Sequence, residues 1–370
     1  MLYMHQSPYR HDTILGKLPD LFTFENGQQV LNTEGWQKRR KEILDSAIDL
    51  EYGGLPPKPD VFYVEIMHQM KNLTSYRIET GTHAKTMTFT MQLFHPNSEE
   101  LCPVVLTGDG CYRKCETKVI NEALSRGIAV AKFNRTELAH DMYNNERKTG
   151  LYAVYPGLSY SAISAWAWGY HRCVDLLVHC GKIDPKHIAI TGHSRGGKTV
   201  LLAGATDERI YYTNPNNSGA HGCGCYRYQQ NEPDSSGDKA SETMGDLFRA
   251  VPYWMGPELR KYVGCEETLP HDMHFIKALV APRCFLQTEA LGDIWANPRG
   301  SFQTYLAAKK VWRLFDAQDN CTAVYREGGH DHSFADFCVL FDMIDAKRHG
   351  KSLAPKYHAD HFPGMKTIFT

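Results

Sequence analysis

The chain has 370 residues, with 41 basic and 42 acidic side chains and a formal net charge of -1. A charge this close to zero gives no general attraction to nucleic acid or to an anionic membrane, so we expect neither as a partner. The length suits one large α/β domain with insertions, and we expect a single domain over residues 1–370. Nothing in the composition indicates the number of subunits.

We expect a cytoplasmic protein. The first residues, MLYMHQSPYRHDTILGKLPD, contain no uninterrupted apolar stretch of signal-peptide length. No later segment approaches the roughly 20 apolar residues of a membrane span. The eleven cysteines are odd in number and scattered, which favours reduced thiols over a disulfide framework.

The N-terminal third predicts an extension followed by antiparallel strands. Residues 1–60 are mixed in character and predict an irregular N-terminal extension that ends at the Gly/Pro breaker YGGLPPKP. FYVEI and KTMTFTMQLFHP then predict two antiparallel strands.

The middle of the chain alternates short apolar strands with helical stretches. The predicted strands are CPVVLTG, IAVAKFN, HIAITG and RIYYTN. Strands that alternate with helices at this spacing predict right-handed crossovers and a mostly parallel central sheet flanked by helices.

Residues 221–271 interrupt this alternation. They are rich in Gly, Ser, Asp and aromatic residues, and we expect an insertion there, after the sixth strand and near the active site. The alternation resumes with strand RCFLQTE, helix PRGSFQTYLAAKKVWRLF, strand CTAVYREGG and a last helix FADFCVLFDMIDAKRHG.

The stretch AITGHSRGGKTV contains the pattern G-x-S-x-G around Ser194. Its glycines permit a strained turn between a strand and a helix that exposes the serine hydroxyl. So short a pattern also arises by chance, and a Gly/Ser loop that caps a helix is the alternative. Because the motif follows HIAIT and precedes the small-residue stretch GGKTVLLAGA, we predict an α/β-hydrolase fold with Ser194 as the nucleophile.

A serine nucleophile needs a histidine base and a carboxylate behind it. In α/β hydrolases the three follow the order Ser, acid, His at the ends of successive strands. Asp293 follows RCFLQTE and His330 follows CTAVYREGG, which satisfies that order. Glu289 and His332 compete for the same roles, but Glu289 lies at a strand end that could point into the sheet, and His332 could begin the last helix. Their positions just after predicted strands therefore favour Asp293 as the acid and His330 as the base.

The oxyanion of the reaction also needs hydrogen-bond donors. The backbone amide of Arg195 directly follows the nucleophile, and the turn TGDGC around Asp109 and Gly110 follows an earlier strand. Both positions are typical of oxyanion donors. The turn could equally be an ordinary Gly-rich bend.

Several linked motifs resemble those of glucuronoyl esterases, carbohydrate esterases that cleave esters of glucuronic acid. GHSRGGK resembles the family elbow G-C-S-R-x-G-K, and NSGAHGCGCYR resembles E-S-G-A-G-G-x-x-C-W-R. LPHDMHFIKALVAPR, DIWANPRGSF and GGHD continue the likeness in matching order, over about residues 100–345. The resemblance implies a serine carboxylesterase that acts on uronic acid esters and needs no cofactor.

The resemblance also implies roles for individual residues. Ser194 would be the nucleophile, His330 the base, and the Arg195 side chain would reach the ester carbonyl oxygen. A guanidinium beside a developing oxyanion gives a charge-assisted hydrogen bond, which agrees with that role.

Three further residues would bind the sugar. Lys198 would bind hydroxyls, Trp295 would flank the ring, and Glu242 would accept from another hydroxyl. A Trp face suits the apolar side of a pyranose. Lys198 could instead be a solvated helix residue, Trp295 a core aromatic, and Glu242 lies in the insertion, where the likeness is hardest to align.

One position departs from the family pattern. Many members place the triad glutamate in E-S-G-A, whereas this chain has Asn217 in NSGA. An amide cannot accept a proton or carry the charge that an imidazolium needs. Other members carry the acid after the next strand, where Asp293 stands, so the departure favours Asp293.

We expect no metal site. HDHSFAD and HDMH superficially resemble ligand pairs, but neither reproduces a recognised zinc arrangement. The expected substrate is a small or oligosaccharide uronate ester, such as a methyl ester of glucuronate or galacturonate. A sugar O-acetyl or acyl esterase with the same triad, and a noncatalytic carbohydrate-binding protein on this scaffold, are the alternatives.

Overall fold

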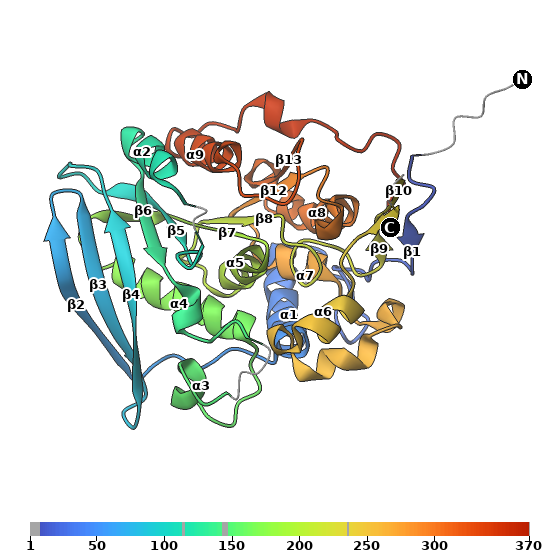
Figure 1. Cartoon of the computed structure of the whole chain (residues 1–370). Helices are drawn as coiled ribbons and strands as arrows, with labels where there is room; N and C mark the ends of the chain where they lie inside the picture. Colours follow the sequence, from blue (N-terminus) through green and yellow to red (C-terminus); the bar gives the residue numbers. More distant parts are fainter. Residues whose placement is uncertain (1–7, 113–114, 143–146, 235–236, 370) are drawn as a thin grey trace, which may run out of the picture.

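The computed structural model describes residues 8–112, 115–142, 147–234 and 237–369. In these residues, nine strands form one central sheet with the spatial order β13-β12-β8-β7-β5-β6-β4-β3-β2 (Figure 1). The strands are β2 (Val61–Met70), β3 (Leu73–Gly81), β4 (Thr86–Phe94), β5 (Cys102–Thr107), β6 (Ala129–Phe133), β7 (Ile183–His193), β8 (Tyr212–Asn216), β12 (Cys284–Ala290) and β13 (Cys321–Arg326). The neighbours from β6 to β13 pair in parallel, whereas β2, β3 and β4 form an antiparallel edge. The predicted mostly parallel sheet is confirmed.

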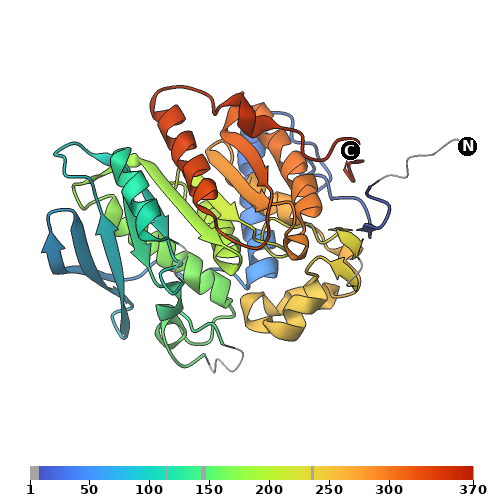
Figure 2. The ribbon, with the colours of Figure 1, turned by 45° about the horizontal axis from the view of Figure 1, so that its top comes forward.

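Helices cover both faces of the sheet (Figure 2). The α-helices are α1 (Thr33–Tyr52), α2 (Thr117–Ser125), α3 (Leu151–Val154), α4 (Ala162–Leu177), α5 (Arg195–Thr206), α6 (Met244–Ala250), α7 (Met273–Ala278), α8 (Pro298–Leu314) and α9 (Phe334–Arg348). Alternation along β5 explains the two layers. Val105 belongs to the apolar cluster that includes residues of α2 and α9, whereas Val104 and Leu106 belong to the cluster that includes residues of α4 and α5. The helices of the two layers thus bury apolar side chains against opposite faces of the sheet.

Short elements fill the connections. The 3-10 helices are η1 (Arg135–Glu137), η2 (Pro252–Trp254), η3 (Pro257–Tyr262), η4 (Glu266–Thr268), η5 (Ile294–Ala296), η6 (Gln318–Asn320) and η7 (Pro355–His358). Two small antiparallel pairs, β1 (Thr13–Ile14) with β9 (Tyr228–Gln229) and β10 (Asn231–Asp234) with β11 (Gly237–Ala240), lie outside the central sheet.

The N-terminal stretch is less irregular than the sequence predicts, because it contains α1. The Asn32 side chain caps the helix by accepting from the Gly35 amide, and Gly53 ends it in the left-handed region with φ 71°. Helix α1 contacts η3, which lies in residues 221–271, and Figure 1 shows α1 beside α6 of the same stretch. The N-terminal stretch therefore packs against residues 221–271.

Strand β3 is a second difference from the sequence prediction. It pairs with β2 on one side and with β4 on the other, so it joins the two predicted antiparallel strands. Residues 221–271 consequently follow the seventh strand of the sheet in chain order, β8, and not the sixth. Among the helices of the described residues, none combines the length and the apolar character that crossing a bilayer requires.

Candidate active site

Ser194 stands on a tight turn between β7 and α5. Its backbone has φ 56° and ψ -120°, an unfavourable region for a residue with a side chain. Gly192 is required there, since a Cβ atom on it would lie 2.6 Å from the Gly196 carbonyl oxygen. The turn is held from the neighbouring strand, because the Ser194 amide donates to the Asn216 carbonyl at 2.9 Å.

The structure brings three predicted residues together at the carboxyl ends of β7, β12 and β13. His330 Nε2 lies 3.0 Å from Ser194 Oγ, and His330 Nδ1 lies 2.6 Å from Asp293 Oδ2. The Asp293 side chain is 3% exposed and the His330 side chain 42% exposed. This arrangement suits an imidazole that donates from Nδ1 to a buried carboxylate and accepts the serine proton at Nε2.

The two competing residues lie elsewhere. Glu289 is buried, and its Oε2 accepts from Ser301 Oγ at 2.9 Å. His332 is buried as well and stacks on the Phe337 ring, with 3.9 Å between the ring centroids. Asp293 and His330 are therefore the pair that faces Ser194.

Burial raises the pKa of Glu289 to about 8 from its ordinary value of 4.5. Between these two values the folded state keeps a proton that the unfolded chain releases, so the free energy of unfolding falls as pH rises. We expect Glu289→Gln to remove this slope and to be the more stable protein at pH 8, by a few kcal/mol. Urea unfolding at pH 5 and pH 8 measures the difference, and parallel losses of stability in both proteins would contradict it.

Arg195 is anchored beside the nucleophile. Its Nη1 donates to Asp141 Oδ2 at 2.7 Å, and its guanidinium lies 4.8 Å from the centroid of the Trp254 ring. Tyr253 Oη and Trp254 Nε1 donate to the other oxygen of Asp141, at 2.9 and 3.0 Å. Burial alone would lower the pKa of Arg195, but the hydrogen bond and the charge of Asp141 raise it. The guanidinium is thus a fixed positive charge near Ser194.

Arg195 also begins α5, so its backbone amide has no acceptor within the helix. That amide and the positive end of the helix are suited to a developing oxyanion.

Gly110 does not provide a free donor, which corrects the sequence prediction. Its amide donates to the Phe133 carbonyl at 2.9 Å, and a Cβ atom on Gly110 would lie 2.6 Å from that same oxygen. The turn supports the elbow through Asp109, whose Oδ2 accepts from the His193 amide at 2.8 Å. Asp109 is buried with Arg135, and the two form an ion pair.

Lys198 uses its hydrogen-bond donors within the protein, contrary to the prediction that it binds sugar hydroxyls. The residue is 2% exposed, and its ammonium group donates to the carbonyls of Ser218 and Ala220 and to Glu242 Oε2. Three acceptors satisfy the three protons of an ammonium group, so no donor is left for a sugar hydroxyl in this arrangement. Lys198 instead holds the loop after β8 and orients Glu242.

Trp295 and Glu242 lie next to each other. The Glu242 amide donates to the Trp295 carbonyl at 2.9 Å, and Trp295 is 50% exposed. A half-exposed indole ring is a ready surface for an apolar sugar face, so Trp295 is not a core aromatic. Glu242 Oε2 lies 2.7 Å from the Lys198 nitrogen, which joins the three predicted sugar-binding residues in one group.

The residues of HDHSFAD and HDMH, the two stretches that resemble metal-ligand pairs, have partners within the protein. Asp336 caps α9 and pairs with Arg326, His271 bonds to Glu51, and His274 bonds to the Pro19 carbonyl. Within the described residues, no three His, Cys, Asp or Glu side chains come together in a way that could hold a metal ion.

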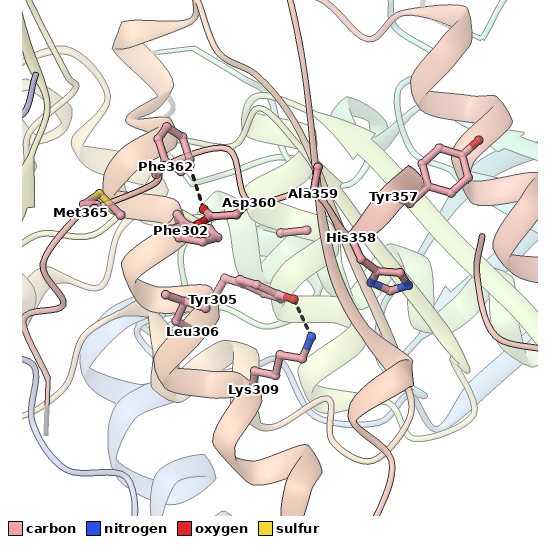
Figure 3. Close-up of a pocket in the computed structure, with 12 residues that line it drawn as sticks. Phe302, Tyr305, Leu306, Lys309, Tyr357, His358, Ala359, Asp360, Phe362 and Met365 are labelled. Carbon is pink, nitrogen blue, oxygen red and sulfur yellow. Dashed lines mark hydrogen bonds between the residues drawn. The ribbon is translucent and has the colours of Figure 1, made fainter. Parts of the chain in front are cut away.

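A hollow of about 370 Å³ lies between α8, β13 and the C-terminal stretch (Figure 3). Aromatic rings line it, and Lys309 donates to Tyr305 Oη across its wall at 2.9 Å. None of the predicted catalytic or sugar-binding residues lines this hollow. We therefore do not assign it to the reaction.

Asp141, Tyr253 and Trp254 are site residues that the sequence prediction missed. They belong to no motif around the elbow. Asp141 lies 54 residues from its partner Arg195 along the chain, and Trp254 lies 113 residues from its partner Asp141. No local pattern signals such a contact.

Comparisons with known proteins place the chain in a family. A family model described as "Glucuronyl esterase, fungi" matches residues 78–316. The chain is similar to the 4-O-methyl-glucuronoyl methylesterase of Cerrena unicolor, with 30% identity over 85% of this chain and 65% of that protein. It is likewise similar to the 4-O-methyl-glucuronoyl methylesterase of Phanerochaete carnosa, with 31% identity over 85% of this chain and 76% of that protein. The chain thus spans about two thirds of the first relative's length.

A solved structure extends the likeness to the fold. The carbohydrate esterase family 15 glucuronoyl esterase from Caldicellulosiruptor kristjansonii superposes with a TM-score of 0.81 and 26% identity, over 95% of this chain and 97% of that one. The α/β-hydrolase prediction is thereby confirmed. Matched by a family model over more than half of its length, the chain belongs to the glucuronoyl esterase family.

Proposed function

We propose that this protein is a serine carboxylesterase that hydrolyses esters of uronic acids. The observation that carries the proposal is the hydrogen-bonded series Ser194, His330 and Asp293, at 3.0 and 2.6 Å, in a chain of the glucuronoyl esterase family. Relatives that bear the name 4-O-methyl-glucuronoyl methylesterase point to the methyl ester of a glucuronate as the first substrate to test.

In the proposed first step, His330 Nε2 takes the proton of Ser194 while the hydroxyl oxygen attacks the ester carbonyl carbon. Buried Asp293 holds the imidazole by its Nδ1 and balances the charge that develops on it. The Arg195 amide and guanidinium stabilise the oxyanion. The alcohol then leaves with the proton from His330.

In the second step, His330 takes a proton from water while the water oxygen attacks the acyl group on Ser194. The bond between that group and Ser194 Oγ then breaks, His330 returns the proton to Ser194, and the free uronate leaves. Trp295 presents its half-exposed ring to the sugar, and Glu242 is the nearby hydroxyl acceptor. Lys198 orients Glu242 through the 2.7 Å ion pair.

We further propose that residues 1–370 act as one domain in which residues 221–271 form part of the active site. Glu242, Tyr253 and Trp254 come from that stretch and contact Lys198, Asp141 and the Arg195 guanidinium. Deletion of the stretch would therefore remove both the sugar-binding carboxylate and the anchor of Arg195.

The test of the proposed function is hydrolysis by the purified protein. Methyl glucuronate, methyl galacturonate and benzyl glucuronate are assayed beside acetylated xylose, with alcohol or acetate release as the readout. We expect turnover of at least one uronate ester and little release of acetate. Turnover of acetylated sugar with none of the three uronate esters would overturn the proposal in favour of an acyl esterase.

We also propose that the enzyme works in the cytoplasm, on small imported uronate esters. All eleven cysteines lie in the described part of the chain and none of them is in a disulfide, which suits a reducing compartment. Activity measured in separated cell fractions tests this, and activity confined to the culture medium would contradict it.

A further inference from the structure

The side chain of Asn217 links the end of β12, from which the loop of the acid begins, to the loop of the base. Its Oδ1 accepts from the Ala290 amide at 2.8 Å, and its Nδ2 donates to the Asp331 carbonyl at 3.2 Å. Ala290 ends β12 three residues before Asp293, and Asp331 directly follows His330. We propose that Asn217 is a positioning residue that sets the distance between Asp293 and His330, an inference that rests on the proposed function.

The surroundings of Asn217 make this link a stiff one. The residue is 1% exposed, so water does not compete for its hydrogen bonds. Its own amide donates to the Thr288 carbonyl at 3.1 Å, which fixes its backbone against β12. Both side-chain partners are backbone groups, so the bonds hold the backbone at the end of β12 and the backbone of the loop that carries His330.

An amide side chain is what this position requires. A carboxylate could accept from the Ala290 amide, but it could not donate to the Asp331 carbonyl and would place a negative charge against that oxygen. The backbone of Asn217 has φ 40°, in the left-handed region that Asn, Asp and Gly adopt most readily. The position that resembles the glutamate of E-S-G-A therefore carries a group that joins two loops and cannot serve as an acid.

Loss of the link affects proton transfer more than sugar binding. Asn217 bonds to the backbone next to Asp293 and His330. Trp295 and Glu242 are instead held by a backbone hydrogen bond to each other and by the bond of Glu242 to Lys198. Arg326 also donates to the Asp331 carbonyl, at 2.5 Å, so this loop is loosened but not released. We expect a lower kcat with a nearly unchanged KM.

The test compares Asn217→Asp, Asn217→Gly and the control Asn320→Gly. The Asp variant keeps the shape of the side chain and loses the donor, while the Gly variant removes the side chain at a φ that glycine tolerates. Asn320 is a matched control because its Nδ2 donates to the Pro282 carbonyl at 2.9 Å, which ties the opposite ends of β12 and β13.

The readouts are kcat and KM on the uronate ester, the unfolding temperature, and the rate at which a small fluorophosphonate labels Ser194. The labelling rate reports activation of Ser194 without any sugar, so it stays readable if no uronate ester is hydrolysed and the proposed function fails. We expect both Asn217 variants to label about tenfold to hundredfold more slowly, since small misplacements of reacting groups have effects of this size. Asn320→Gly should label at the rate of the unaltered protein.

If Asn217→Gly fails to fold, the test still stands, because the result of Asn217→Asp decides it. Labelling and kcat of Asn217→Asp equal to those of the unaltered protein would overturn the inference. An equal loss of labelling in Asn320→Gly would overturn it too, since the effect would then follow stability and not position.

Discussion

Replacing Ser194 with Ala is expected to lower the turnover number for methyl glucuronate by about a millionfold, as removal of a triad nucleophile typically does. The reason is that Ser194 Oγ is the group that His330 Nε2 faces, at 3.0 Å. Methanol release by purified protein measures the change. An indifferent Ser194→Ala variant would instead favour the carbohydrate-binding alternative.

Ser98→Ala is the matched control for that experiment. Ser98 lies on the surface, where its hydroxyl accepts from the Glu100 amide at 3.1 Å, in the connection before β5. We expect full activity from this variant. If Ser194→Ala kept more than about a thousandth of the turnover, a different nucleophile would be at work.

Asp293→Asn is expected to lower kcat by about ten thousandfold, because a neutral amide neither fixes the imidazole tautomer nor balances its charge. The carboxylate it replaces is buried at 2.6 Å from His330 Nδ1. The expected loss is in kcat, while KM changes little, since Asp293 lies on the other side of the imidazole from Ser194. Steady-state kinetics on methyl glucuronate separate the two constants.

Glu289→Gln is the control for Asp293→Asn. It alters a carboxyl group only four residues away, but one that bonds to Ser301 inside the core. We expect turnover close to that of the unaltered protein at pH 7. A large loss in Glu289→Gln together with a mild one in Asp293→Asn would reverse the assignment of the acid.

The meeting of Ser194, Asp293 and His330 was predictable because each of these residues follows an apolar strand. Parallel strands end at one edge of the sheet, so Ser194, Asp293 and His330 had to meet there once the alternation of strands and helices was recognised. The same reasoning separated Asp293 from Glu289, which belongs to β12 itself and points inward.

Helix α1 could not be predicted from the sequence because its buried face contains charged residues. That face includes Arg39, which lies 5.4 Å from the Phe275 ring centroid, and Glu51, which bonds to His221 and His271. Charged residues on the inner side blur the apolar period that marks a helix, and their partners are far away along the chain. The alternation along β3 was similarly weak, because buried Thr74 and Thr80 flank its apolar residues.

The roles of Lys198 and Gly110 depend on distant hydrogen bonds. A motif gives the residue type and its place, but the acceptors of Lys198 lie 20 to 44 residues further on, in the loop after β8 and in Glu242. The Gly110 amide is used by β6, a neighbouring strand. Such partners become visible only when the chain is folded.

If the protein works as proposed, the uronoyl group of the ester is transferred to Ser194 and the alcohol leaves. The most direct test of this claim is mass spectrometry of the peptide that contains Ser194, after acid quenching at successive times during turnover of methyl glucuronate. Acid protonates the imidazole and stops hydrolysis of the acyl group, so we predict a fraction of that peptide heavier by one glucuronoyl group. Substrate consumed while this peptide stays unmodified at every quench time, or an acyl group on another residue, would contradict the claim.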